Sequence, residues 1–143
     1  MKFSKIRYED LNSRERETYN FLKAGAILAD YGFSVMRLSE DWNDADFIAY
    51  RRSESKTLRV QLKSRFDIHK KYLGKGLWVM FPVKGDWYLI EHDRLVRLVG
   101  KTTPYLESSS WKQKGGGYSL PNVSKELLEG LAEWSVGKEG MRR

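Results

Sequence analysis

One helix followed by an almost uninterrupted series of strands constrains what the first part of this chain can fold into. Asn12 and Glu15 have the spacing of a capping box, and an apolar helical pattern continues from there to Tyr31, with Gly32 at the expected helix stop. Short alternating or apolar runs then predict strands at residues 33–39, 46–51, 57–64, 77–83 and 87–91. This order predicts an α/β fold in which the long N-terminal helix packs on a central mixed sheet of about five strands.

The rest of the chain predicts short C-terminal helices separated by a loop. Helices are expected at residues 94–99 and 125–134, the second capped by Ser124. Between them the composition shifts to Ser, Thr, Gly, Pro and Lys, and residues 111–118 are expected to form a flexible basic loop. The length fits a single domain, 1–143, in which residues 1–10 and 137–143 are expected to be flexible.

The composition excludes several classes of site. The chain has no cysteine, so it has neither disulfides nor thiolate metal sites. His69 and His92 lack the paired spacing of zinc ligands, whereas a hard cation held by oxygen atoms is compatible with the sequence. No apolar run approaches the ~20 residues that span a bilayer, and the first residues do not lead into a signal segment. We therefore expect a cytoplasmic protein that is not inserted in a membrane.

The charge balance is strongly basic. The net charge is +7 and the sequence pI is ≈ 9.6. This favours a polyanionic partner, with nucleic acid ahead of an anionic membrane surface. An ordinary solvated basic surface is the alternative interpretation.

Polar residues stand at the ends of two neighbouring predicted strands. Asp46 begins one strand, and Gln61 and Lys63 flank Leu62 near the end of the next. Because side chains alternate along a strand, we expect Gln61 and Lys63 to face one polar site while Val60 and Leu62 face the core. An acid, an amide oxygen and a lysine on adjacent strands predict a metal-dependent phosphodiester site. The alternative is a surface strand with ordinary polar residues.

These residues also carry a family resemblance. Ala45-Asp46 before an apolar run, Gln61-Leu62-Lys63 fifteen positions on, and Glu17 on the preceding helix resemble the PD-(D/E)XK nuclease superfamily, which includes restriction endonucleases and Holliday-junction resolvases. The chain departs from the family pattern twice, with Ala45 in place of the proline and Gln61 in place of an acid. It is also similar to a group of small bacterial proteins that share the tracts L-A-D-Y-G-F, A-D-F-I-A, V-Q-L-K and W-Y-L.

The superfamily resemblance implies a restriction-endonuclease-like core and an endonuclease that hydrolyses DNA phosphodiester bonds with Mg²⁺ or Mn²⁺. Asp46, Gln61, the backbone carbonyl of Leu62 and Glu17 would then hold the metal, with Asp44 as the runner-up to Glu17. Lys63 would orient or deprotonate the attacking water, or stabilise the charge on the phosphate. A non-catalytic nucleic-acid-binding module and a protein-interaction subunit are the alternatives.

A basic stretch follows the predicted site directly. Lysines and arginines here are expected to contact phosphates, with DNA preferred to RNA. These expected nucleic-acid contacts are Arg65, Lys70, Lys71 and Lys75. A solvated loop is the alternative, and a homodimer is a further possibility because many small nucleases cut two strands as dimers.

Overall fold

The computed structural model describes residues 1–138, apart from the side chain of Asp41, and has four helices and eight strands within that range. The helices are α1 (Ser13–Ala29), α2 (His92–Thr102), α3 (Ser109–Lys112) and α4 (Lys125–Leu131). The strands are β1 (Phe33–Trp42), β2 (Ala45–Arg51), β3 (Lys56–Leu62), β4 (Phe66–His69), β5 (Trp78–Val83), β6 (Asp86–Glu91), β7 (Gly117–Leu120) and β8 (Ser135–Val136).

The central sheet has six strands in the order β1-β2-β3-β5-β6-β8. Within it β3 and β5 are parallel and the other neighbours are antiparallel, so the sheet is mixed and the predicted α/β class is confirmed. The sheet has one strand more than expected because the two residues of β8 pair with Trp87 and Tyr88 at the edge.

A separate two-stranded sheet, β4–β7, corrects the prediction of a flexible loop at residues 111–118. Within the stretch 100–121, residues 109–112 form α3 and residues 117–120 form β7. Glycine and serine gave this segment no local strand signal. Tyr118 and Leu120 nevertheless pack against the core, so tertiary contacts decide its conformation.

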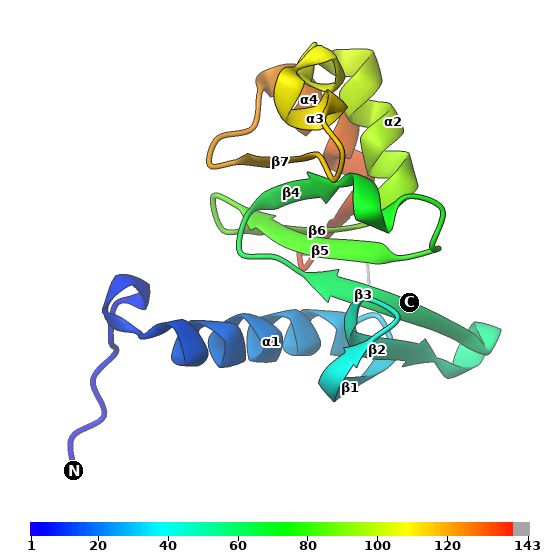
Figure 1. Cartoon of the computed structure of the whole chain (residues 1–143). Coiled ribbons are helices and arrows are strands. Elements are labelled where there is room, and N and C mark those ends of the chain that lie inside the picture. The colour runs from blue at the N-terminus through cyan, green and yellow to red at the C-terminus, as the bar shows by residue number, and fades with distance from the viewer. Residues whose placement is uncertain (139–143) are drawn as a thin grey trace.

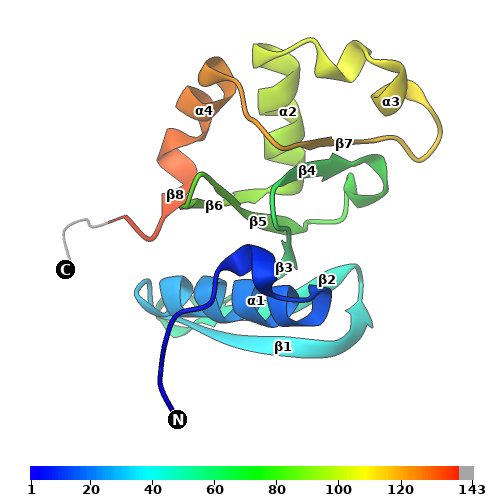
Figure 2. The same ribbon diagram turned by 90° about the vertical axis from the view of Figure 1, so that its left-hand side faces the viewer.

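Helices cover the sheet from two sides (Figures 1 and 2). The apolar residues of α1 pack with Phe47, Ala49, Leu58 and Val60 of β2 and β3. Residues of α2 and α4 pack with β4 and the opposite faces of β5 and β6. The predicted packing of the long N-terminal helix against the sheet is therefore observed.

The two local signals at the ends of α1 are confirmed. The Asn12 side chain accepts a hydrogen bond from the Glu15 backbone at 2.9 Å, and the Glu15 carboxylate accepts one from the Asn12 N–H at 2.8 Å. This reciprocal pair satisfies two backbone donors that no helical carbonyl can reach. Gly32 has a φ of 80°, the left-handed conformation expected just beyond a helix end.

The connection between β1 and β2 is shorter than predicted. Residues 40–42 extend β1, and Trp42 pairs with Ala45 across a two-residue turn. Asn43 and Asp44 both have positive φ, at 49° and 67°, as a tight hairpin turn of this hand requires. Asn and Asp tolerate that conformation better than other non-glycine residues. The turn brings Asp44 next to the end of β3.

The chain ends are partly attached to the body. Tyr8–Asp10 forms a 3-10 turn, and the backbone carbonyls of Tyr8 and Glu9 accept hydrogen bonds from Arg16 on α1. Near the other end, the Gly137 N–H donates to the Tyr31 hydroxyl at 2.9 Å. Residues 139–143 of the expected flexible tail lie outside the described residues.

None of the helices in the described part of the chain has the length and apolarity needed to cross a membrane.

Candidate functional site

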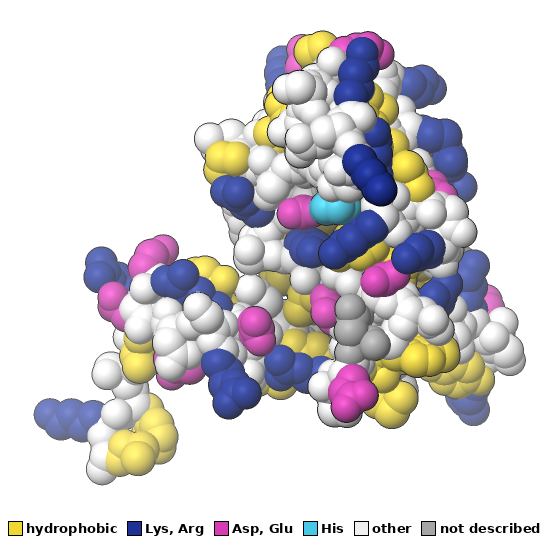
Figure 3. Space-filling model, in the orientation of Figure 1, with side chains coloured by type: hydrophobic (Ala, Val, Ile, Leu, Met, Phe, Trp, Pro, Cys, Tyr) yellow, Lys and Arg dark blue, Asp and Glu magenta, His cyan; other side chains and the backbone are white. Residues whose placement is uncertain are grey.

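An open hollow of about 1200 Å³ lies between the N-terminal half of α1 and the ends of β2 and β3. Glu17, Asp46, Leu62 and Lys63 all line it. Figure 3 shows the depression between the part of the surface formed by α1 and the rest of the molecule. The structure therefore brings together residues that lie far apart in the sequence and that the motif selected.

Asp46 lies where β2 and β3 separate. The antiparallel register between the two strands ends at Phe47 and Val60. Beyond this pair the Asp46 carboxylate takes the place of a backbone acceptor, because its Oδ2 accepts a hydrogen bond from the Leu62 N–H at 2.8 Å. A carboxylate has about four acceptor positions, and this bond orients the group by occupying one of them.

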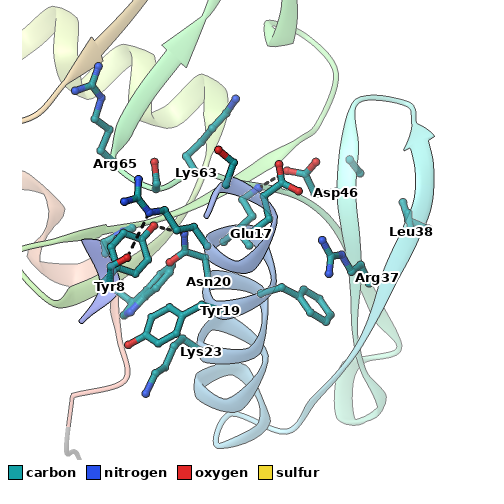
Figure 4. A pocket seen from close by; sticks show the side chains of 18 of the residues that line it. Tyr8, Glu17, Tyr19, Asn20, Lys23, Arg37, Leu38, Asp46, Lys63 and Arg65 are labelled. Atoms are coloured by element: carbon teal, nitrogen blue, oxygen red, sulfur yellow. Dashed lines mark hydrogen bonds between the residues drawn. The ribbon is translucent and has the colours of Figure 1, made fainter. Parts of the chain in front are cut away.

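Glu17 belongs to a helical row that changes character along α1. Ala24 and Leu28 of this row are fully buried against the sheet, and Asn20 one turn earlier is buried but polar. Glu17 precedes Asn20 by three positions, so it lies on the same side of the helix. It is exposed because the N-terminal half of α1 extends past β1 to β3 (Figure 1). Figure 4 shows Glu17 and Asp46 extending into the same hollow from opposite walls.

Lys63 is held at the hollow by its backbone. Its N–H donates to the Met80 carbonyl at 2.9 Å, which continues the β3–β5 pairing. Its ammonium group lies 5.5 Å from the centre of the Tyr72 ring, and the Lys71 ammonium lies 5.0 Å from the same ring. Figure 4 shows the Lys63 side chain pointing away from the two carboxylates.

Gln61 does not line the hollow, and the expected common face of Gln61 and Lys63 is not observed. Its side chain is buried, and its amide nitrogen donates to the Asp44 carbonyl in the β1–β2 turn. Both Val60 and Gln61 are buried, contrary to the predicted alternation, because the hairpin turn covers the second face of β3 here. In this arrangement Gln61 stabilises the turn.

Asp44 is also engaged outside the hollow. Its carboxylate forms an ion pair with the Lys75 ammonium at 2.7 Å. This hydrogen bond from Lys75 is the main reason that the pKa of Asp44 lies below its usual value. Glu17 lines the hollow, whereas Asp44 does not.

Cationic side chains that the sequence did not single out form the rim of the hollow. Arg16, Lys23 and Arg37 line it together with the predicted Arg65. The Arg37 guanidinium donates to the Thr18 hydroxyl at 3.4 Å and lies 5.4 Å from the Phe21 ring centre, which fixes β1 against α1. The spacing of Arg16 and Lys23 along the helix relative to Asn20 is a signal that was available from the sequence.

The four predicted phosphate contacts are distributed over a wider surface. Arg65 lines the hollow, whereas the Lys70 ammonium lies 5.7 Å from the Trp111 ring centre and Lys75 is paired with Asp44. Lys70 and Lys71 lie in the 3-10 turn Lys70–Tyr72 directly after β4. Figure 3 shows several Lys and Arg side chains gathered on this side of the molecule.

A fully buried histidine anchors the basic turn after β4. The His92 Nε2 accepts a hydrogen bond from the His69 N–H at 3.1 Å, and the neighbouring Asp93 accepts one from the Gly74 N–H at 2.9 Å. Burial lowers the pKa of His92, and the hydrogen bond with Asp93 opposes that shift only in part. The first helical turn of α2 thus holds residues 69–74 in place.

This anchor predicts a pH-dependent stability. Because the pKa of His92 is lower in the folded chain than its ordinary value of 6.5, the unfolded chain binds the proton more readily. We expect the free energy of unfolding to be maximal above pH 7 and to fall as the pH decreases below 6.5, by up to about 1.4 kcal/mol per pH unit. Urea titrations at several pH values measure this slope. His92→Gln should reduce it, and an unchanged slope would contradict the assignment.

The side chains at the hollow offer oxygen atoms, the ligand type that hard divalent cations prefer. Within residues 1–138, no three His, Cys, Asp or Glu side chains converge as a metal-binding group. Glu17 and Asp46 provide two carboxylates, and Leu62 lines the same hollow. Mg²⁺ commonly binds through one or two carboxylates, completing its shell with water and substrate phosphates. The donor set therefore suits Mg²⁺ or Mn²⁺ better than zinc.

The fold and the hollow together define an α/β protein with a mixed sheet and a solvent-open site that has an acidic centre and a cationic rim. No family matches the sequence, and the comparison with curated proteins finds no match. Among solved structures, the chain is similar to the bacterial homing endonuclease I-Ssp6803I, with 16% identity, a TM-score of 0.42 and coverage of 80% of both chains.

Proposed function

We propose that this chain is a metal-dependent endonuclease that hydrolyses phosphodiester bonds of DNA. The observation that supports it is the arrangement of the hollow, where Glu17, Asp46 and Lys63 from three separate elements line one open space. The cationic rim beside these residues suits the phosphates on either side of a scissile bond.

In this proposal, Glu17, Asp46 and the Leu62 carbonyl hold Mg²⁺ or Mn²⁺. When bound, such a metal polarises a phosphate oxygen and lowers the pKa of water. The hydrogen bond from the Leu62 N–H keeps the Asp46 carboxylate directed at the hollow before any ligand arrives. Glu17 supplies the second negative charge that Gln61 does not provide.

Lys63 acts on the reacting phosphate or water. Its flexible four-carbon side chain can turn from the Tyr72 ring into the hollow, because a cation on an aromatic ring gains only about 0.5–2 kcal/mol. An anionic phosphate beside Asp46 attracts the ammonium more strongly than the ring does. There Lys63 holds the attacking water or stabilises the charge that develops on the phosphate oxygens.

A plasmid assay tests the function directly. With Mg²⁺ or Mn²⁺ the purified chain should convert supercoiled DNA to nicked or linear forms, and EDTA should stop the reaction. Absence of cleavage with either metal, across a range of DNA forms, would refute the proposal.

A homodimer, which would place two such hollows on two strands, stays a prediction that sedimentation with and without DNA can check.

Lys63→Met should lower the cleavage rate about 10²- to 10³-fold, the loss expected when a group that stabilises transition-state charge is removed. Methionine keeps the side-chain length, so DNA affinity should fall far less than the rate. Single-turnover cleavage and fluorescence anisotropy measure the two quantities separately. The matched control is Lys56→Met, since Lys56 is exposed at the far end of β3 and does not line the hollow. If the Lys63→Met protein cleaves DNA at the wild-type rate, Lys63 has no role in catalysis.

A non-catalytic nucleic-acid-binding module is the second candidate function. Two observations favour it: Gln61 donates to the Asp44 carbonyl, and the Lys63 ammonium lies on the Tyr72 ring. Such a module would bind DNA in EDTA with a strong salt dependence and without cleavage. Its binding would also survive Asp46→Asn, because removal of an acid from a cationic surface does not weaken contact with phosphates.

A further inference from the structure

The two-stranded sheet β4–β7 presents a polar face next to the hollow. Its antiparallel register places Asp67 opposite Ser119 and His69 opposite Gly117. Directly opposed residues lie on the same face of a sheet, so these four positions share one surface. The alternate residues of β4 are fully buried in the core, which fixes the polar face outward.

Arg65 is oriented along this face by a cross-strand contact. Its Nε donates to the Ser119 hydroxyl at 2.8 Å, and that hydroxyl lies 3.5 Å from the Phe66 carbonyl. The contact uses Nε, so the terminal amino groups of the guanidinium can serve another partner. Arg65 also lines the hollow, so the polar face continues directly into the candidate site.

His69 is fixed in one place and in one tautomer. Its Nδ1 accepts a hydrogen bond from the Lys71 N–H at 3.3 Å, so the neutral ring carries its hydrogen on Nε2. The ring lies across Gly117, where an added Cβ would come within 2.7 Å of the His69 Cδ2. Burial and the charge of Lys71 lower the pKa of His69, which favours this neutral form. His69 therefore offers a single N–H donor at a defined position.

Asp67 adds an acceptor to this face, beside the cationic Arg65. An acid there repels phosphates, but a carboxylate accepts hydrogen bonds from the amino group of cytosine. Arginine pairs with guanine through its terminal amino groups, and a serine hydroxyl pairs with several bases. The major groove of duplex DNA, ~12 Å wide, admits a two-stranded β-ribbon. The face thus combines the groups and the shape that base-edge recognition requires.

We propose that Arg65, Asp67, His69 and Ser119 on the β4–β7 ribbon contact base edges in the major groove of duplex DNA beside the phosphate bound in the hollow. This inference rests on the proposed function for the identity of the polymer. It adds that the substrate is double-stranded and that its sequence next to the scissile bond matters.

A binding selection from a randomised duplex library, carried out in EDTA, tests the ribbon without requiring cleavage. The wild-type chain should enrich a short sequence motif. Arg65→Ala and Asp67→Asn should each relax the preference at a different base pair, lowering discrimination there about 5- to 100-fold. The matched controls Arg97→Ala on the exposed side of α2 and Asp86→Asn at the start of β6 should enrich the wild-type motif.

The failures of this inference and of the proposed function are distinguishable. Cleavage of plasmid DNA with no enriched motif, or with the same motif for the ribbon variants, would overturn the ribbon assignment alone. A uniform loss of affinity in Arg65→Ala across all sequences would do the same, because it marks a phosphate contact. An enriched motif without cleavage would support the ribbon and refute the nuclease. Asp67→Asn has the same shape as the native residue, so it keeps the test valid if Arg65→Ala does not fold.

Discussion

Asp46→Asn should lower metal-dependent cleavage by about 10³-fold, the upper end of losses caused by removing one charge-stabilising group. Asparagine retains a side-chain oxygen that can accept the hydrogen bond from the Leu62 N–H, so the local structure should persist. What disappears is the negative charge opposite Glu17. Neutral oxygens bind Mg²⁺ more weakly than carboxylates, so the variant should also need more metal to reach its residual rate.

The control for this variant is Asp86→Asn, since Asp86 is an exposed acid at the start of β6 and does not line the hollow. Its cleavage rate and metal dependence should match the wild type. Thermal denaturation with and without Mn²⁺ gives a readout that does not depend on catalysis, because a ligand that binds only the folded state raises its stability. An Asp46→Asn protein that cleaves at the wild-type rate would end the assignment of Asp46.

Phe47→Ala should destabilise the chain by about 3–5 kcal/mol. Phe47 is fully buried, and its ring packs against the Phe21 ring at a centroid distance of 5.6 Å. It belongs to the apolar cluster that holds Ala24 and Leu28 of α1 against the sheet. Removing the ring leaves a cavity beneath the helix that carries Glu17. Guanidinium denaturation followed by circular dichroism measures the loss.

Tyr50→Ala is the matched control for this stability change. Tyr50 lies on the same strand but is 41% exposed, so its truncation should cost less than about 1 kcal/mol. If Phe47→Ala lowers the free energy of unfolding by less than about 1 kcal/mol, α1 is not packed on β2 as described. Cleavage should also fall in Phe47→Ala at temperatures where the wild type is still folded, because the wall that bears Glu17 depends on this contact.

The sequence predicted the features that depend on local chemistry. The capping box of Asn12 and Glu15, the stop at Gly32 and the approximate positions of the main strands need only neighbouring residues, and all are observed. The positions of Glu17 and Asp46 on one hollow follow from the same elements once the helix packs on the sheet. The mixed α/β architecture could therefore be predicted from the sequence alone.

The features that the sequence did not predict depend on contacts between distant segments. The strand Gly117–Leu120 forms because it pairs with β4, about 50 residues earlier, and its own residues carry no strand signal. Gln61 was expected at the site because it occupies a motif position, but the turn at Asp44 offers its amide a backbone carbonyl. The contribution of Arg37 to the rim likewise requires knowing how β1 approaches α1.

The N-terminal half of α1 extends past the sheet, so the position of Glu17 depends on the tilt of the helix. The apolar packing of the helix on the sheet begins at Phe21, whose ring contacts Phe47, and Glu17 precedes Phe21 by four residues. At 1.5 Å per residue, this stretch is about 6 Å long, so a tilt of about 10° would move the carboxylate by about 1 Å. The 3-10 turn at Tyr8 steadies the free end through Arg16 and through the hydrogen bond from Asn20 to the Tyr8 hydroxyl at 3.0 Å. The separation of the two carboxylates is thus set by how firmly residues before the helix hold its end, at a distance from the chemistry itself.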